Sequence, residues 1–222
     1  MLYLYAAMSS FSEQIIVLNA TKTGESSLVI HALSRNLGRR SFITNIAKGR
    51  RALYEPLSLI DCEIVENPKS DLWRLKGASA PHPLENLRSN MQKNAITLFV
   101  SETLWRSLKD GDGREIFDWL RTSILLLEEL PAPCSNFHLY WLLRYAAALG
   151  FSALPEDVAP FAGEHFDEIR YLIQENFDDC MRLPLKGKDR SEIAAALLDY
   201  ISFHNDSPLH IRSLEVLSQI FG

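Results

Sequence analysis

The chain has 222 residues, of which 47% are hydrophobic and 23% are charged. This is ordinary globular composition, so it excludes a wholly disordered chain, and the length allows one large or two small domains. The three cysteines, Cys62, Cys134 and Cys180, lie far apart, which argues against a disulfide scaffold or a cysteine zinc site. Residues 1–8 are apolar but too short to span a membrane and lack a cationic start. We therefore expect a cytoplasmic protein without a transmembrane segment.

The formal net charge of −5 is unevenly distributed. Residues 1–84 contain ten basic and seven acidic residues, a net charge of +3, whereas the remainder contains 13 and 21, a net charge of −8. Residues 26–54 contain no acid at all but six cations: Arg35, Arg39, Arg40, Lys48, Arg50 and Arg51. Such a run attracts a polyanion, although an ordinary solvated surface would also account for it.

Residues 1–84 have the pattern of short β-strands. Strands are predicted at residues 14–20, 28–34, 40–48, 57–65 and 72–76, with turns at residues 36–38 and 67–71. Gly38 is available for a positive φ in the first of these turns. Five short strands joined in this way favour a small closed barrel of the OB type, and an SH3-like barrel fits the periodicity almost as well. Two prolines in residues 78–83 indicate a boundary after which the pattern changes.

After this boundary the apolar residues recur with helical spacing. Helices are predicted at residues 85–109, 114–130, 137–149, 165–182, 191–204 and 210–221, and residues 151–163 are predicted to be a loop. The fold class is therefore α+β with two domains. We expect an OB-fold nucleic-acid-binding domain at residues 1–84 and a helical carboxy-terminal domain at residues 85–222.

Signatures of catalysis are absent from the sequence. It contains no P-loop, GxGxxG, HExxH or GxSxG motif. Residues 110–113 (DGDG) are similar to the start of a calcium loop, but Arg114 and Arg121 stand where further oxygen ligands are required. None of the six histidines forms an i,i+4 pair. We therefore expect no catalytic residue, no metal site and no cofactor, and a protein that is not an enzyme.

Several motifs resemble those of the RecO family. Near the amino terminus these are residues 23–30 (TGESSLVI), 37–39 (LGR), 47–51 (AKGRR) and 56–60 (PLSLI). Further along, residues 136–139, 142–144 and 149–151 look like the family's central helix, and residues 211–217 (IRSLEVL) look like its final helix. The matches span residues 14–218 in the family's order.

The resemblance implies a bacterial mediator of DNA repair and recombination, with an OB-fold followed by a helical domain. Such proteins bind single- and double-stranded DNA and anneal complementary strands. With RecR, and in some organisms RecF, they help load RecA onto DNA covered by single-stranded-DNA-binding protein (SSB), whose tail they contact. The resemblance implies a cytoplasmic location, at the nucleoid during repair. Many members carry a four-cysteine zinc site, but residues 151–165 contain no cysteine, so zinc is not expected.

The expected sites follow from the charge pattern and the resemblance together. Phosphates are expected to bind Lys22, Arg35, Arg39, Arg40, Lys48, Arg50, Arg51, Arg74 and Lys76. Phe42, Tyr54 and Trp73 are candidates for base stacking, or else they fill the barrel core. A basic cluster of Arg182, Lys186, Lys188 and Arg190 could receive the acidic SSB tail, or else it is a solvated loop. An OB-fold RNA-binding or adaptor module of another pathway is the alternative function.

Overall fold

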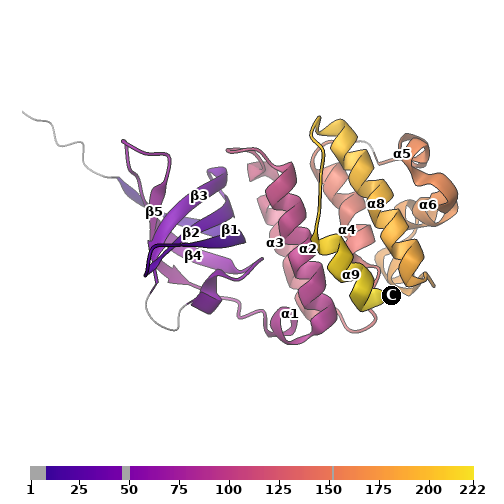
Figure 1. Cartoon of the computed structure of the whole chain (residues 1–222), viewed down its shortest axis with the longest axis horizontal. Coiled ribbons are helices and arrows are strands. Elements are labelled where there is room, and N and C mark those ends of the chain that lie inside the picture. The colour runs from indigo at the N-terminus through magenta and orange to yellow at the C-terminus, as the bar shows by residue number, and fades with distance from the viewer. Residues whose placement is uncertain (1–8, 47–50, 152) are drawn as a thin grey trace, which may run out of the picture. The chain divides into compact units, whose positions relative to one another are not determined.

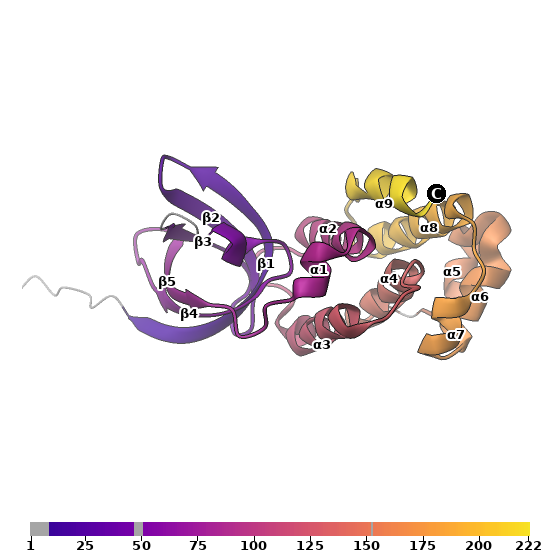
Figure 2. The same ribbon diagram turned by 90° about the horizontal axis from the view of Figure 1, so that it is seen from below.

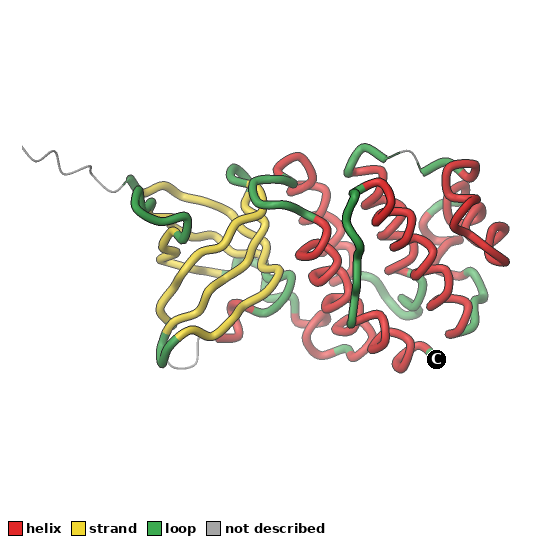
Figure 3. The backbone as a smooth tube through the Cα atoms, turned by 45° about the horizontal axis from the view of Figure 1, so that its top comes forward, coloured by secondary structure: helices red, strands yellow, loops and turns green. Residues whose placement is uncertain are grey.

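A computed structural model describes residues 9–46, 51–151 and 153–222 of the chain. The described residues form two compact units. The first consists of the residues up to Pro83 together with Lys109–Phe117, and the second consists of Leu84–Leu108 and Asp118–Gly222. Strands belong to the first unit and the long helices to the second (Figure 3), which confirms the predicted α+β class. Among the described residues, no helix is both long and apolar enough to cross a membrane.

The first unit is a closed five-stranded barrel (Figure 1). Its strands are β1 (Ser10–Thr23), β2 (Ser27–Ser34), β3 (Gly38–Asn45), β4 (Leu59–Val65) and β5 (Trp73–Ser79). They are hydrogen-bonded in the order β1-β2-β3-β5-β4, and β4 returns to pair with β1. The β3–β5 pair is parallel and the other pairs are antiparallel. The predicted OB-like barrel is therefore confirmed.

Alternation along the strands fills the barrel interior. Leu28, Ile30 and Ala32 of β2 and Phe42 of β3 are completely buried in one apolar cluster, because every second side chain of a strand points to the same side. The turn between β2 and β3 uses Gly38 at φ +72°. A Cβ atom at Gly38 would collide with the backbone carbonyls of Gly111 and Asp112, so this position requires glycine for space as well as for conformation.

The second unit is helical (Figure 2). Its helices are α1 (Glu85–Ser89), α2 (Met91–Ser107), α3 (Phe117–Glu129), α4 (Phe137–Ala148), α5 (Pro155–Ala162), α6 (Phe166–Gln174), α7 (Phe177–Arg182), α8 (Gly187–His204) and α9 (Ser213–Phe221). A short 3₁₀ turn at Gly163–His165 belongs to this unit, whereas the 3₁₀ turns at Arg51–Tyr54 and Arg114–Ile116 belong to the first unit. Helix α2 packs on α9, and α4 packs on α8.

Three predicted elements differ from the structure because a new helix begins inside the predicted range. The predicted helix at 85–109 is interrupted at Asn90, whose side chain accepts the N–H groups of Gln92 and Lys93 and so begins α2. The predicted helix at 165–182 is divided in the same way by Asn176, which caps α7. The predicted loop at 151–163 contains α5, which begins at Pro155, because proline is well suited to the first turn of a helix.

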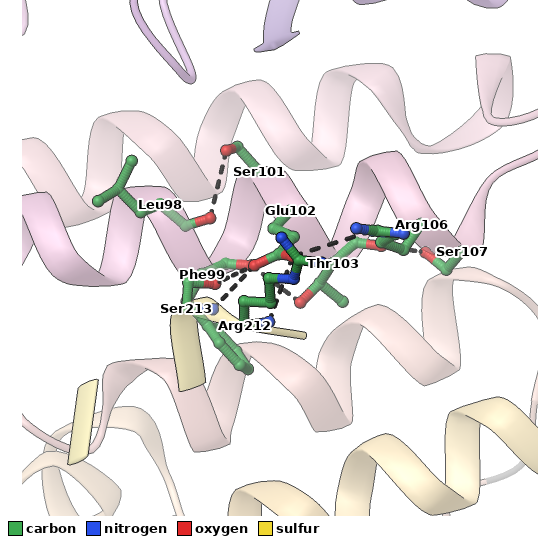
Figure 4. A network of polar contacts seen from close by, with 9 residues as sticks. All are labelled: Leu98, Phe99, Ser101, Glu102, Thr103, Arg106, Ser107, Arg212 and Ser213. Carbon is green, nitrogen blue, oxygen red and sulfur yellow. Dashed lines mark hydrogen bonds and ion pairs between the residues drawn. The ribbon is translucent and has the colours of Figure 1, made fainter. Parts of the chain in front are cut away.

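Helix α9 is held at its first turn by a carboxylate from α2 (Figure 4). Glu102 Oε2 accepts the N–H of Ser213 at 2.9 Å and its hydroxyl at 2.7 Å, and Oε1 accepts the N–H of Arg212 at 3.2 Å. Burial raises the pKa of Glu102, but the hydrogen bonds from Ser213 and Arg212, with the nearby Arg106, bring it below its usual range. Glu102 therefore satisfies amide groups that have no partner within α9.

Candidate nucleic-acid interface

The outer surface of strands β3 and β5 carries part of the predicted cation set. Phe42 and Leu75 point into the core, so their neighbours along each strand point outward. Ile43 of β3 is in register with Arg74 of β5, which makes the two strands adjacent here. Arg74 and Lys76 are exposed on β5. Glu63 stands opposite Lys76 on β4 and reduces the positive charge at that end.

Arg39 lies on the same outer surface, but its side chain and its backbone are bonded to the acidic turn at residues 110–112. Its guanidinium forms an ion pair with Asp110, and only 15% of its side chain is exposed. The backbone of Arg39 is bonded to the same turn. Its N–H donates to the Asp112 carbonyl at 2.7 Å, and its carbonyl accepts the N–H of Gly111 at 2.8 Å. Burial lowers the pKa of the adjacent His31, Arg39 lowers it further, and Asp110 opposes them. The negative charge of Asp110 therefore offsets part of the positive electrostatic potential around Arg39.

Arg40 lies on the inward-facing side of β3, at the end of the barrel. Its guanidinium carbon is 3.7 Å from the centre of the Trp73 ring, a close cation–π contact. The Trp73 ring in turn meets Phe11 edge-on, at 6.5 Å between ring centres. The stack lies beside an open cleft of about 560 Å³. The cleft is lined by Leu37, Arg39, Arg40, Ser41, Asp71, Leu72, Asp110 and Gly111.

The other predicted phosphate-binding residues are spread around the barrel. Lys22 is exposed at the end of β1, and Arg51 is exposed at the start of a 3₁₀ turn. Arg35, in the turn after β2, donates to Gln14 Oε1 at 2.7 Å and lies 5.8 Å from the Phe117 ring centre. Lys48 and Arg50 lie outside the described residues. The described cations therefore occupy several sides of the barrel instead of one continuous surface.

The aromatic residues proposed for base stacking divide into two groups. Phe42 is completely buried and Tyr54 is 6% exposed, and both belong to the barrel core. Their assignment as stacking platforms is wrong in this structure, because neighbouring core side chains cover their rings; the alternative, core filling, describes them. Trp73 is half-buried, and one face of its ring is covered by Arg40.

The four residues of the basic cluster in the helical unit differ in their exposure. Arg182 is exposed at the end of α7, and Lys186 and Lys188 are exposed at the start of α8. Arg190 is instead half-buried, and it donates to Asn136 Oδ1 at 2.8 Å and to the Phe221 carbonyl at 3.4 Å. Burial lowers the pKa of Arg190, with Asp189 opposing the shift. Arg190 therefore ties α8 to the start of α4 and the end of α9.

A cluster of possible metal ligands and a cysteine thiol are candidates for chemistry other than nucleic-acid binding. Within the described ranges, His165, Asp189 and Glu192 approach the spacing of a metal site. His165 Nε2 already contacts Glu192 at 2.8 Å, and Asp189 accepts the N–H of Lys186 at 3.1 Å as a helix cap. Cys62 is buried in the barrel, and burial raises its pKa to about 12, which leaves the thiol protonated and unreactive.

Two acidic residues near the cations were not anticipated. The sequence indicates only that Asp110 lies in a DGDG segment that does not fit a calcium loop, and that Asp71 ends a predicted turn. Both line the cleft with Arg39 and Arg40. Asp110 is 71 positions from Arg39 in the sequence, so no local pattern joins the two.

Comparisons with known proteins cover most of the chain. Residues 8–83 match the family model described as "Recombination protein O N terminal", and residues 88–154 match the model described as "Recombination protein O C terminal". A protein of Phocaeicola vulgatus named "DNA repair protein RecO" is 28% identical, with 93% of this chain and 97% of that protein covered. Proteins of the same name from Bacteroides fragilis and Flavobacterium psychrophilum are each 27% identical, with the same coverage.

Proposed function

The chain belongs to the RecO family of DNA repair proteins, and from that premise we propose that it acts as a recombination mediator. In this role it binds single- and double-stranded DNA without sequence preference, anneals complementary strands and, with RecR, assists the loading of RecA. The observation that carries the proposal is the match of both the barrel and the helical part to the models of one repair family.

The barrel surface supports binding through the nucleic-acid backbone. Arg74 and Lys76 are exposed two residues apart on β5, and Lys22 and Arg51 are further exposed cations elsewhere on the barrel. Every nucleotide has the same phosphate, so contacts from such residues do not depend on sequence. Counter-ions leave the strand when these cations bind, which makes the affinity strongly salt-dependent.

Annealing follows from this electrostatic role without any covalent step. Two complementary strands repel each other through their phosphates, and a cationic surface lowers that repulsion. Because the surface contacts phosphates and not base edges, the bases remain able to pair. The protein would therefore act as a binding partner of DNA and not as an enzyme.

The protein partners are assigned by family membership. RecR, and in some organisms RecF, would act with this protein in loading RecA. The tail of SSB is acidic, and the exposed cations Arg182, Lys186 and Lys188 of the helical unit could receive it. Arg190 is left out of this assignment, since its guanidinium is bonded inside the unit.

A salt titration combined with a strand-annealing assay tests the function. If about six phosphates are neutralised, the logarithm of the affinity for a single strand should fall against the logarithm of salt concentration with a slope near −4. The double variant Arg74→Gln/Lys76→Gln should make the slope about 1.4 units shallower and should slow annealing, because each lost phosphate contact accounts for roughly 0.7.

The matched control is Arg106→Gln/Arg170→Gln, which removes two exposed cations from the helical unit and should leave the slope unchanged. A slope near zero for the unaltered protein would contradict the proposal. A matched RNA strand that displaces DNA at far lower concentration would favour the RNA-binding alternative instead.

A further inference from the structure

We propose that the cleft beside β3 binds one unstacked base of a single strand, on the guanidinium plane of Arg40 with the Trp73 ring behind it. This inference rests on the proposed function and specifies which form of nucleic acid the barrel prefers. It assigns Arg40 as the base-contacting residue and Trp73 as a positioning residue that acts through Arg40.

The position of Arg40 distinguishes it from the neighbouring Arg39. Arg39 is held by Asp110, whereas Arg40 forms no ion pair among the residues described and lies 3.7 Å over the Trp73 ring. Phe42, the next inward-pointing residue, is fully buried, so the stack lies where the barrel interior ends. Arg40 lines the cleft and Trp73 does not. The ring covers one face of the guanidinium, and our proposal places the base on the other face, at the cleft that Arg40 lines.

The charge of the cleft argues for a base and against a phosphate. Its lining contains two arginines, Arg39 and Arg40, and two aspartates, Asp71 and Asp110, so its formal charge is zero. A phosphate entering the cleft would be repelled by the carboxylates as much as it is attracted by the guanidinium groups. A neutral base suits it better, because a guanidinium plane can stack on a base and the carboxylates can accept hydrogen bonds from base amino groups.

The same geometry predicts a preference for single strands. In a duplex each base is stacked on its neighbours and paired along its edge, so it cannot enter a cleft without unpairing. The volume of about 560 Å³ is within the range of small-ligand pockets. The barrel would therefore bind duplexes through outer cations such as Arg74 and Lys76, and single strands through these cations and the cleft together.

Strands that differ only in their bases provide the test. An oligodeoxycytidine strand and a strand of equal length made of abasic residues carry the same phosphates, and both are titrated by fluorescence anisotropy. The unaltered protein should bind the cytidine strand about tenfold more tightly, as expected for one stacked base. Arg40→Lys keeps the charge but removes the plane, so it should abolish most of this preference and leave the salt slope unchanged.

Two further variants separate stacking from charge and from folding. Trp73→Leu should reduce the preference for cytidine as Arg40→Lys does, while the affinity for the abasic strand stays constant. Arg114→Lys makes the same exchange at an exposed arginine of the first unit that neither lines the cleft nor belongs to the proposed phosphate contacts, and it should leave the preference intact. Each variant is compared with the unaltered protein for its urea unfolding midpoint.

The outcomes that overturn the inference differ from those that overturn the function. Equal binding of both strands by the unaltered protein, or equal weakening of both by Arg40→Lys, would show that Arg40 is only a phosphate contact. The proposed function would survive that result, since salt-dependent binding would remain. The absence of binding to either strand would overturn the function and the inference together.

Discussion

The barrel and the helical unit use their charged residues in opposite ways. In the helical unit several charges are bonded inside the fold: Glu102 holds the first turn of α9, Glu128 accepts the N–H groups of Asn86 and Leu87 in α1, and Arg190 joins α8 to Asn136. On the barrel, Lys22, Arg51, Arg74 and Lys76 are exposed at the surface.

This difference shows that the number of charges in a region is a poor guide to its role. The helical unit contains many charged residues, yet those that are bonded inside the fold, such as Glu102, Glu128 and Arg190, provide partners for polar groups at helix ends. The barrel has fewer charges, but their positions on the strands direct several of them to solvent. A substitution in the first set should therefore alter stability, and one in the second set should alter nucleic-acid affinity.

The largest expected effect tests whether the barrel also depends on an internal contact. Gly38→Ala places a Cβ atom against the carbonyls of Gly111 and Asp112 at a positive φ. We expect a loss of roughly 3 kcal/mol in unfolding free energy, because the left-handed backbone and the steric collision both oppose alanine. Gly24→Ala is the matched control, since its φ is +65° but no atom lies within 4 Å, and it should cost only about 1 kcal/mol. Equal losses in urea denaturation would show that the contact with Gly111 is unimportant.

The second prediction tests the structural role of charge in the helical unit. Glu102→Gln should reduce the unfolding free energy by about 2 kcal/mol at neutral pH, because three donors lose a charged acceptor. The lowered pKa of Glu102 means that its contribution is complete above the unfolded-state value of about 4.3 and is lost as the pH falls through the folded-state value.

The difference between the unaltered protein and Glu102→Gln should therefore shrink below about pH 4 when urea denaturation is followed as a function of pH. Glu215→Gln, an exposed change on α9 itself, serves as the control and should have little effect. A difference that stays constant down to pH 3 would contradict the assignment, and so would altered DNA affinity in Glu102→Gln at neutral pH.

The smallest expected effect sharpens the account of the barrel surface. Asp110 is 83% exposed and pairs with Arg39. Asp110→Asn should release Arg39 for a phosphate, raise the affinity for single strands about two- to threefold at low salt and steepen the salt slope by roughly 0.7. Asp118→Asn, an exposed change on α3, is the control in the same salt titration. An unchanged slope in Asp110→Asn would mean that Arg39 does not reach the nucleic acid.

The sequence predicts the fold more completely than the site. Alternation and turn residues such as Gly38 are local signals, and they were sufficient for the five-stranded barrel and for most helices. The breaks at Asn90 and Asn176 were missed because an asparagine in an apolar pattern does not reveal that its side chain will cap the next helix. The pairing of Arg39 with Asp110 and the capping of α9 by Glu102 join residues 71 and 111 positions apart. Such contacts depend on tertiary structure, so a count of cations along the chain could not separate Arg39 from Arg74.

The acidic turn at residues 110–112, which is bonded to β3, also determines where the chain can be truncated. A truncated chain ending near residue 84 would retain all five strands but would lose Gly111 and Asp112, which satisfy the N–H and C=O of Arg39. Unsatisfied strand edges recruit other chains, so such a fragment is expected to self-associate. A stable isolated barrel would therefore need residues 109–117, which belong to the same compact unit, rejoined to it by an artificial linker.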